Sequence, residues 1–103
     1  MVDTTPLLRA VVLFADRLRA APQSRLQRGA AAEALRLAQE LSRWAQGVEA
    51  PGVEARVMPD AGMFAVADQI TVAAHDLAVV LRSEGEVEEA VRVVEEARKR
   101  AGV

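Results

Sequence analysis

The residues with the clearest chemical potential lie in the apolar segment 63–81. His75 is the single histidine of the chain, and Asp68 and Thr71 fall on the same side of a helix because seven and four residues separate them from it. A histidine beside a carboxylate can transfer protons, and a hydroxyl beside a histidine can become a nucleophile. A zinc site, however, needs three or four ligands, and only His75 and Asp68 have a usable spacing. We therefore interpret these groups as the solvated stripe of a helix and expect a non-enzymatic protein with no metal and no cofactor.

A second chemical feature is a basic cluster with no acidic residue inside it, formed by Arg17, Arg19, Arg25 and Arg28. Guanidinium groups bind phosphates, and such contacts position a nucleic acid without reading its sequence. The chain nevertheless carries 13 basic and 15 acidic residues, for a net charge of −2, and no aromatic residue interleaves the arginines. We therefore favour a solvated turn and disfavour nucleic acid as a partner. The alternative is a small nucleic-acid-associated regulatory protein that uses this turn.

The apolar segment 63–81 is long enough to span a bilayer, but it contains Asp68, His75 and Asp76. Each aspartate near the centre of a membrane helix costs about 2.5–3.5 kcal/mol, so we expect a buried helix and no membrane contact. The N-terminal stretch has no basic region ahead of its apolar run, which disfavours a secretory signal. The absence of cysteine suits a reducing compartment, and we expect a cytoplasmic protein.

These residues must be positioned by helices, and the 103 residues are expected to form one all-α domain. We predict four helices arranged as two antiparallel αα-hairpins in a four-helix bundle, with the first hairpin at 5–46, a connecting loop at 47–59 and the second hairpin at 60–101. The start of each predicted helix is indicated by residues that commonly cap or begin helices. They are Thr5 with Pro6, the capping-box pair Ser24 and Gln27, Asp60, and the capping-box pair Ser83 and Glu86.

Two of the predicted helices are apolar on two sides. In the helix at 60–82, Phe64, Val72 and Val79 lie off the main apolar stripe, and in the first helix Val12 and Leu13 do so. A helix with two apolar sides is either central in its own fold or covered by another chain. We therefore predict a protein–protein interaction or oligomerisation module, most simply a homodimer, that uses these five residues.

Trp44 stands near the end of the second predicted helix, on its apolar face. It can be a core residue or an interface anchor, and we add it to the candidate interface residues.

The second hairpin resembles a tetratricopeptide repeat over residues 71–103. The family's large–small–large triad is matched by Leu77, Ala78 and Leu81, the turn by Gly85, and the second helix by Ala90, Val94 and Ala97. Ala74 stands in place of the family's tryptophan and Gly102 in place of its terminal proline. The resemblance implies a helical hairpin with the character of an interaction module.

Overall fold

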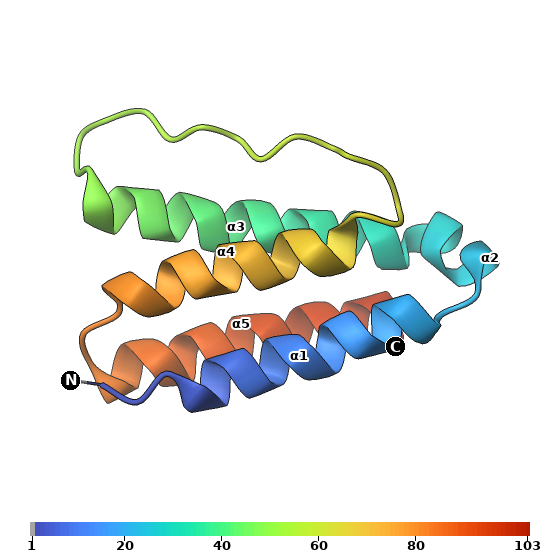
Figure 1. Cartoon of the computed structure of the whole chain (residues 1–103), viewed down its shortest axis with the longest axis horizontal. Coiled ribbons are helices and arrows are strands. Elements are labelled where there is room, and N and C mark those ends of the chain that lie inside the picture. Colours follow the sequence, from blue (N-terminus) through green and yellow to red (C-terminus); the bar gives the residue numbers. More distant parts are fainter. Residues whose placement is uncertain (1) are drawn as a thin grey trace.

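The computed structural model describes residues 2–103, and within them the chain is all-helical (Figure 1). Four long helices make up the fold, as predicted, and shorter helical segments join the first two of them. The elements are α1 (Thr5–Ala20), α2 (Gln23–Arg25), the π-helical turn η1 (Leu26–Ala30), α3 (Ala31–Glu49), α4 (Val66–Val80) and α5 (Glu84–Ala101).

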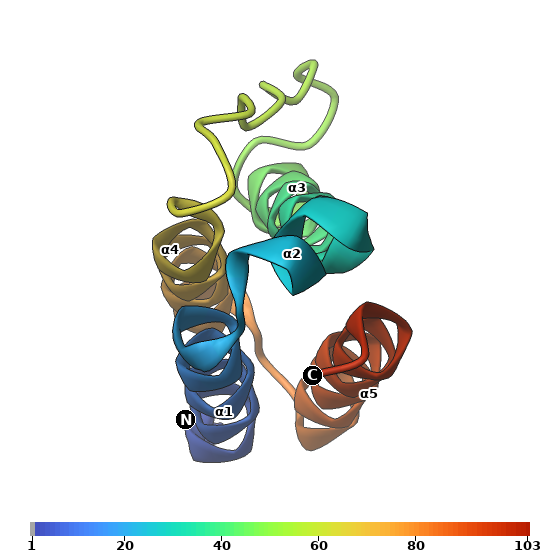
Figure 2. The ribbon, with the colours of Figure 1, turned by 90° about the vertical axis from the view of Figure 1, so that its right-hand side faces the viewer.

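The four long helices form a bundle in which each packs mainly against two others. Helix α1 packs against α4 and α5, and α3 packs against the same two helices. The two helices of each hairpin, α1 with α3 and α4 with α5, run antiparallel, as the hairpin prediction requires, but they lie diagonally across the bundle (Figure 2). Each hairpin therefore buries its apolar faces against helices of the other hairpin, so the two halves of the chain share one core.

The core is built from aliphatic residues and many alanines. Among residues 2–103, every buried side chain is apolar. Phe14 is the largest fully buried one, and the fully buried alanines come from α3, α4 and α5. Alanine lets two helix backbones approach closely, and dense packing compensates for the small area that each alanine buries. The alanines with no exposed surface are Ala34, Ala38, Ala73, Ala74, Ala90 and Ala97.

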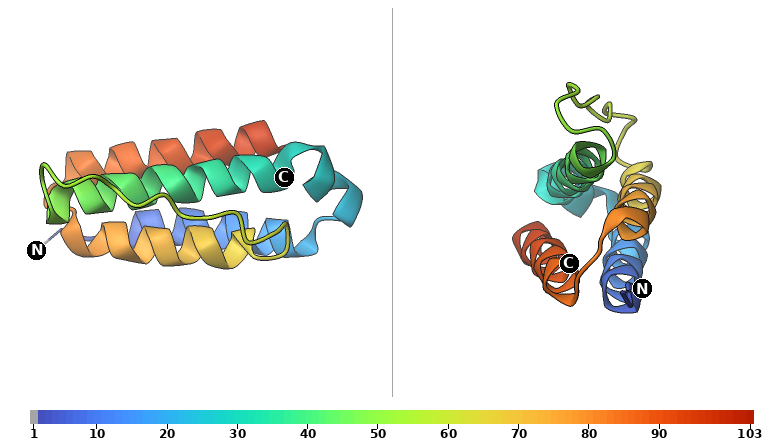
Figure 3. Two further views of the ribbon diagram at one scale, coloured as in Figure 1. Left: turned by 90° about the horizontal axis from the view of Figure 1, so that it is seen from above. Right: turned by 90° about the vertical axis from the view of Figure 1, so that its left-hand side faces the viewer.

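Helices α3 and α4 run parallel, although they follow one another in the chain. The segment 50–65 leaves one end of α3 and returns along the whole bundle to begin α4 (Figures 1 and 3). A helix of 15 residues, such as α4, is about 22 Å long, and an extended chain covers about 3.3–3.6 Å per residue. A tight turn cannot span that distance, which explains why this connection is long.

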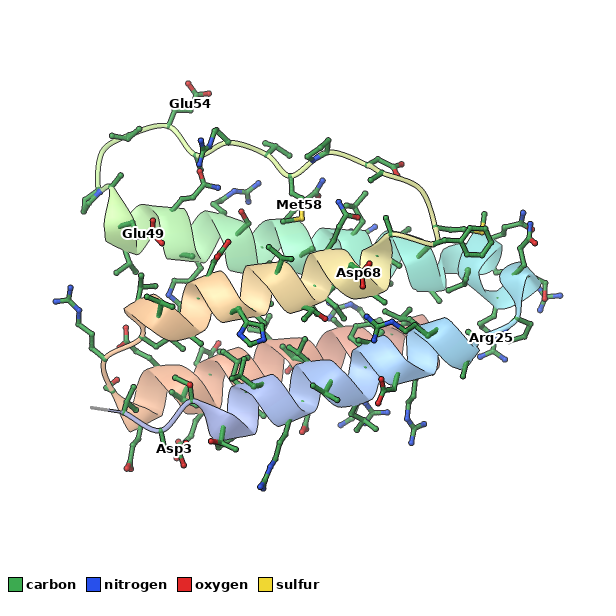
Figure 4. All side chains as sticks on the ribbon, in the orientation of Figure 1. Asp3, Arg25, Glu49, Glu54, Met58 and Asp68 are labelled. Atoms are coloured by element: carbon green, nitrogen blue, oxygen red, sulfur yellow. The ribbon has the colours of Figure 1, made fainter. Side chains whose placement is uncertain are left out.

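Three glutamines hold the crossover segment against the bundle. The Gln46 amide donates to the Arg56 carbonyl at 2.8 Å and accepts from the Arg56 backbone N–H at 2.9 Å. Gln39 donates to the carbonyl of Met58, and Gln69 donates to the carbonyl of Pro59, both at 2.9 Å. The Met58 side chain, which packs against the core, points from the crossover toward α3 (Figure 4).

The crossover is longer than predicted because the prediction placed a helix start at Asp60. In the structure, the Asp60 carboxylate accepts a hydrogen bond from the Gly62 N–H at 2.8 Å and so closes a local turn. Gly62 has φ of 95°, which an α-helix cannot include, and α4 begins only at Val66. At its other end the crossover begins at residue 50, because α3 continues to Glu49.

The second predicted helix is interrupted near its start. Gly29 has φ of 151° inside η1, and the helix axis changes there. The capping box predicted at Ser24 and Gln27 is wrong, since Pro22 is the residue that precedes the helical turn and makes no side-chain cap. The glycine provides a backbone conformation that other residues rarely adopt, which allows the chain to change direction between α1 and α3.

The predicted capping box of the last helix is confirmed. The Ser83 hydroxyl accepts from the Glu86 N–H at 3.2 Å, and the Glu86 carboxylate accepts from the backbone N–H groups of Arg82 and Ser83 at 3.0 Å. The bond from Arg82 is the main cause that holds the pKa of Glu86 below its usual value. The capping interaction is therefore present at neutral pH and is lost as the pH falls through that lowered pKa.

Substitution of Ser83 by alanine should lower the free energy of unfolding by about 1 kcal/mol, because the first turn of α5 loses its cap. For a chain of this size the midpoint of thermal unfolding should fall by about 4–8 °C in a circular-dichroism melt. Ser24→Ala is the matched control, since Ser24 makes no cap and its loss should leave the melting curve unchanged. Equal effects of the two substitutions would contradict the assigned caps.

Substitution of Gln46 by alanine should release the middle of the crossover, because both hydrogen bonds to Arg56 are lost. Each such bond contributes about 0.5–1.5 kcal/mol. Amide hydrogen exchange should show loss of protection at Arg56, while amides of α3 remain protected. Gln23→Ala serves as the control, and unchanged exchange at Arg56 in Gln46→Ala would show that the crossover is held by other contacts.

Candidate functional site

The outer face of α4 carries exposed apolar side chains at helical spacing. Val72 and Val79 are 55% and 84% exposed. Phe64, which lies in the turn just before α4 begins, is 75% exposed. Asp68 and His75, also exposed, alternate with them on the same face. The opposite face of the helix is buried in the core. This stripe of Phe64, Asp68, Val72, His75 and Val79 is called the α4 face below.

Helix α1 adds one further apolar side chain beside the α4 face. The Arg19 guanidinium donates to the Asp68 carboxylate at 2.8 Å, which gives the register of the antiparallel helices α1 and α4. Val12 lies two turns before Arg19 on the same side of α1, and His75 lies two turns after Asp68 on α4. Val12, which is 53% exposed, therefore lies at the level of His75.

Leu13 and Trp44 are placed differently from the other predicted interface residues. Leu13 is exposed, but it lies about 100° further round α1 than Val12 and so points away from α4. Trp44 is half-buried and packs against the core. The structure thus brings Phe64, Val72, Val79 and Val12 together along α4 and leaves Leu13 and Trp44 outside this group.

The groups considered for catalysis are engaged in separate interactions. The Thr71 hydroxyl donates to the Ala67 carbonyl at 2.8 Å, within its own helix, and Asp68 is held by Arg19. Asp76 lines a cavity of about 500 Å³ beneath the crossover, on the α3 side of α4. Across residues 2–103, no three acidic or histidine side chains are grouped closely enough to hold a metal ion.

The basic cluster is rearranged by the fold into an arginine pocket. Arg25 and Arg28 approach Arg36 of α3 and Arg100 of α5 around a cavity of about 320 Å³. Glu33, whose side chain is only 17% exposed, binds Arg36 and Arg100, in each case at 3.0 Å. The pocket therefore contains four guanidinium groups and one carboxylate, and its local charge is positive on a chain of negative net charge.

The two remaining predicted arginines lie outside this pocket. Arg19 is paired with Asp68 and lies 3.6 Å from Asp16, so its charge is largely compensated. Arg17 lines a neighbouring cavity with Arg25. Arg36 and Arg100 were missed by the sequence analysis because the approach of the end of α5 to the start of α3 is a tertiary contact.

Another cavity, of about 520 Å³, lies where the kink at Gly29 meets the turn that precedes α4. Its lining includes Leu26, Leu35, Met63 and Val66, with polar groups such as Arg36, Gln39 and Asp60. It is separate from the α4 face, and of the residues named in the sequence analysis only Gln27 and Asp60, both predicted as helix-start residues, line it.

Comparison of the chain with family models, with curated proteins and with solved structures finds no match. In the part of the chain that the structure describes, no helix combines the length and the apolar character that a membrane crossing requires. The function is therefore inferred from the chemistry of the surfaces described above.

Proposed function

We propose that this chain is a non-enzymatic protein–protein interaction module that associates with a second copy of itself through the α4 face. The observation that carries the proposal is the exposure of Val72 and Val79 on one face of a helix whose other face is buried, together with the exposure of Phe64 in the turn that precedes this helix. Exposed apolar side chains grouped on one face and bordered by polar residues mark interaction surfaces. The tetratricopeptide-like pattern of the second hairpin and the cysteine-free composition support an interaction module that works in the cytoplasm.

Covering this face has a clear energetic benefit. Complete burial of a valine or phenylalanine side chain contributes about 1.5–3 kcal/mol, and a symmetric dimer counts each side chain twice. The association entropy and the ordering of side chains offset part of that gain. Hydrophobic contacts of this size fit a reversible dimer better than an obligate one.

Light scattering over a concentration series should show a mass that rises from one copy toward two. The paired substitution Val72→Lys and Val79→Lys should return the mass to that of the monomer, because two buried charges on each chain replace apolar contacts. The fold should be unaffected, since both side chains are exposed and lysine is a good helix former.

The matched control is Val53→Lys with Val57→Lys, which changes two exposed valines of the crossover, outside the α4 face. This variant should associate like the unchanged chain. A wild-type mass that stays at one copy at every concentration would contradict self-association, as would a dimer insensitive to the α4 substitutions.

A second candidate function is favoured by the arginine pocket. Four guanidinium groups converge on one concave surface, and a phosphate backbone is a ligand that such a surface can bind. This candidate is a nucleic-acid-associated regulatory protein, in which Arg25, Arg28, Arg36 and Arg100 replace the set predicted from the sequence. The negative net charge of the chain makes it the weaker candidate.

If this second candidate holds, a labelled DNA duplex should bind with a strong dependence on salt in fluorescence anisotropy. The double substitution Arg28→Ala and Arg100→Ala should weaken binding. It should also reduce the slope of log K against log salt concentration by roughly 1–2, since each lost phosphate contact accounts for about 0.9. Arg43→Ala with Arg82→Ala, which lie outside the pocket, are the control with the same charge change. Absence of binding at low salt, or equal effects of both pairs, would exclude the pocket as a phosphate site.

A further inference from the structure

The α4 face is arranged symmetrically about Val72. Asp68 lies one helical turn before Val72 and His75 lies one turn after it. Val79 lies two turns after Val72, and Phe64 lies eight residues before it, in the turn that leads into α4. An acidic group on one side is thus matched by a histidine on the other, and an apolar group is matched by an apolar group.

We propose that two copies of the chain associate through an antiparallel pair of α4 helices, with a two-fold axis passing beside Val72. This geometry rests on the self-association proposed above and specifies it. The two Val72 side chains meet at the axis, Asp68 of one copy faces the partner's His75, and Phe64 faces the partner's Val79. A two-fold interface of this kind is self-complementary, because every contact occurs twice.

The charges on the face favour the antiparallel arrangement over a parallel one. A parallel pair in register would place the two Asp68 carboxylates together and the two His75 rings together, which is unfavourable between like groups. In the antiparallel pair each carboxylate meets an imidazole. Arg19 donates to Oδ1 of Asp68, but the Asp68 side chain is still 79% exposed. Its carboxylate is therefore open to a further donor.

The crossover segment leaves this side of the bundle open. In Figures 2 and 3 the segment 50–65 passes along α3 and the edge of α4, whereas no segment covers the outer side formed by α1 and α4. Asp76 faces the cavity beneath the crossover and so lies at the margin of the α4 face. Two chains can therefore bring their α4 helices together without displacing the crossover.

The absence of cysteine from the chain permits a direct test by single-cysteine cross-linking. A disulfide needs β-carbons about 3.5–4.5 Å apart. Val72→Cys, at the axis, should therefore cross-link to a second copy of itself under mild oxidation. Val79→Cys is the matched control: seven residues at about 1.5 Å each place the two copies of this residue roughly 21 Å apart, so it should not cross-link to itself. A mixture of Phe64→Cys and Val79→Cys should yield the mixed disulfide.

A charge exchange tests the polar pair independently. His75→Asp should weaken dimerisation by roughly 2–5-fold, because it sets two carboxylates against each other. Adding Asp68→His to this variant should restore the affinity, measured by sedimentation equilibrium. Restoration is expected only if the two residues meet across the interface.

The outcomes distinguish this geometry from self-association in general. A dimer in which Val79→Cys cross-links to itself, or in which Val72→Cys does not, overturns the antiparallel pair and leaves the interaction module standing. A chain that remains monomeric and forms no cross-link at any of these positions overturns both proposals.

Discussion

The parallel packing of α3 on α4 is the constraint on which the rest of the structure depends. These two helices are successive in the chain, and each buries an aliphatic face rich in alanine. Because both run in the same direction, the chain between them must travel back along the bundle. The length of the crossover, its hydrogen bonds to three glutamines and the diagonal placement of the two helices within each hairpin all follow from this one arrangement.

The same arrangement determines which surfaces are covered. The crossover passes along the side formed by α3 and α4, where Gln39, Gln46 and Gln69 bind its carbonyl groups. The outer side of α4, next to α1, has no comparable cover, and valine and phenylalanine remain exposed there. An uncovered apolar face on an otherwise well-packed bundle is the physical basis of the proposed self-association.

A second set of contacts lies at the end of the bundle where α5 ends and α3 begins. Arg25 donates to the carbonyl of Gly102 at 2.6 Å, just after α5 ends in the left-handed conformation of that glycine. Glu33 binds Arg100, so that α3 and α5 are also connected there. These contacts have a structural role of their own, and they gather arginines that lie far apart in the sequence.

Much of the candidate surface could be predicted from the sequence because it depends on local periodicity. Phe64, Val72, Val79 and Val12 were assigned to a second apolar side by spacing alone, and all four are exposed. The capping box at Ser83 and Glu86 was predictable for the same reason, since its partners are three residues apart. The start of α4 was not, because Asp60 can cap either a helix or a turn and its local sequence does not distinguish them.

The sequence by itself therefore determined the helical class, the approximate extent of each long helix and the faces that are apolar. These depend on interactions between residues three or four positions apart. Only the tertiary structure decided that the long connection is a crossover, that Val12 lies at the level of His75, and that Arg36 and Arg100 join Arg25 and Arg28. Each of these depends on which helices pack together and in which direction. The complementary shapes of whole helix faces decide that packing. The spacing of residues within one helix therefore does not reveal it.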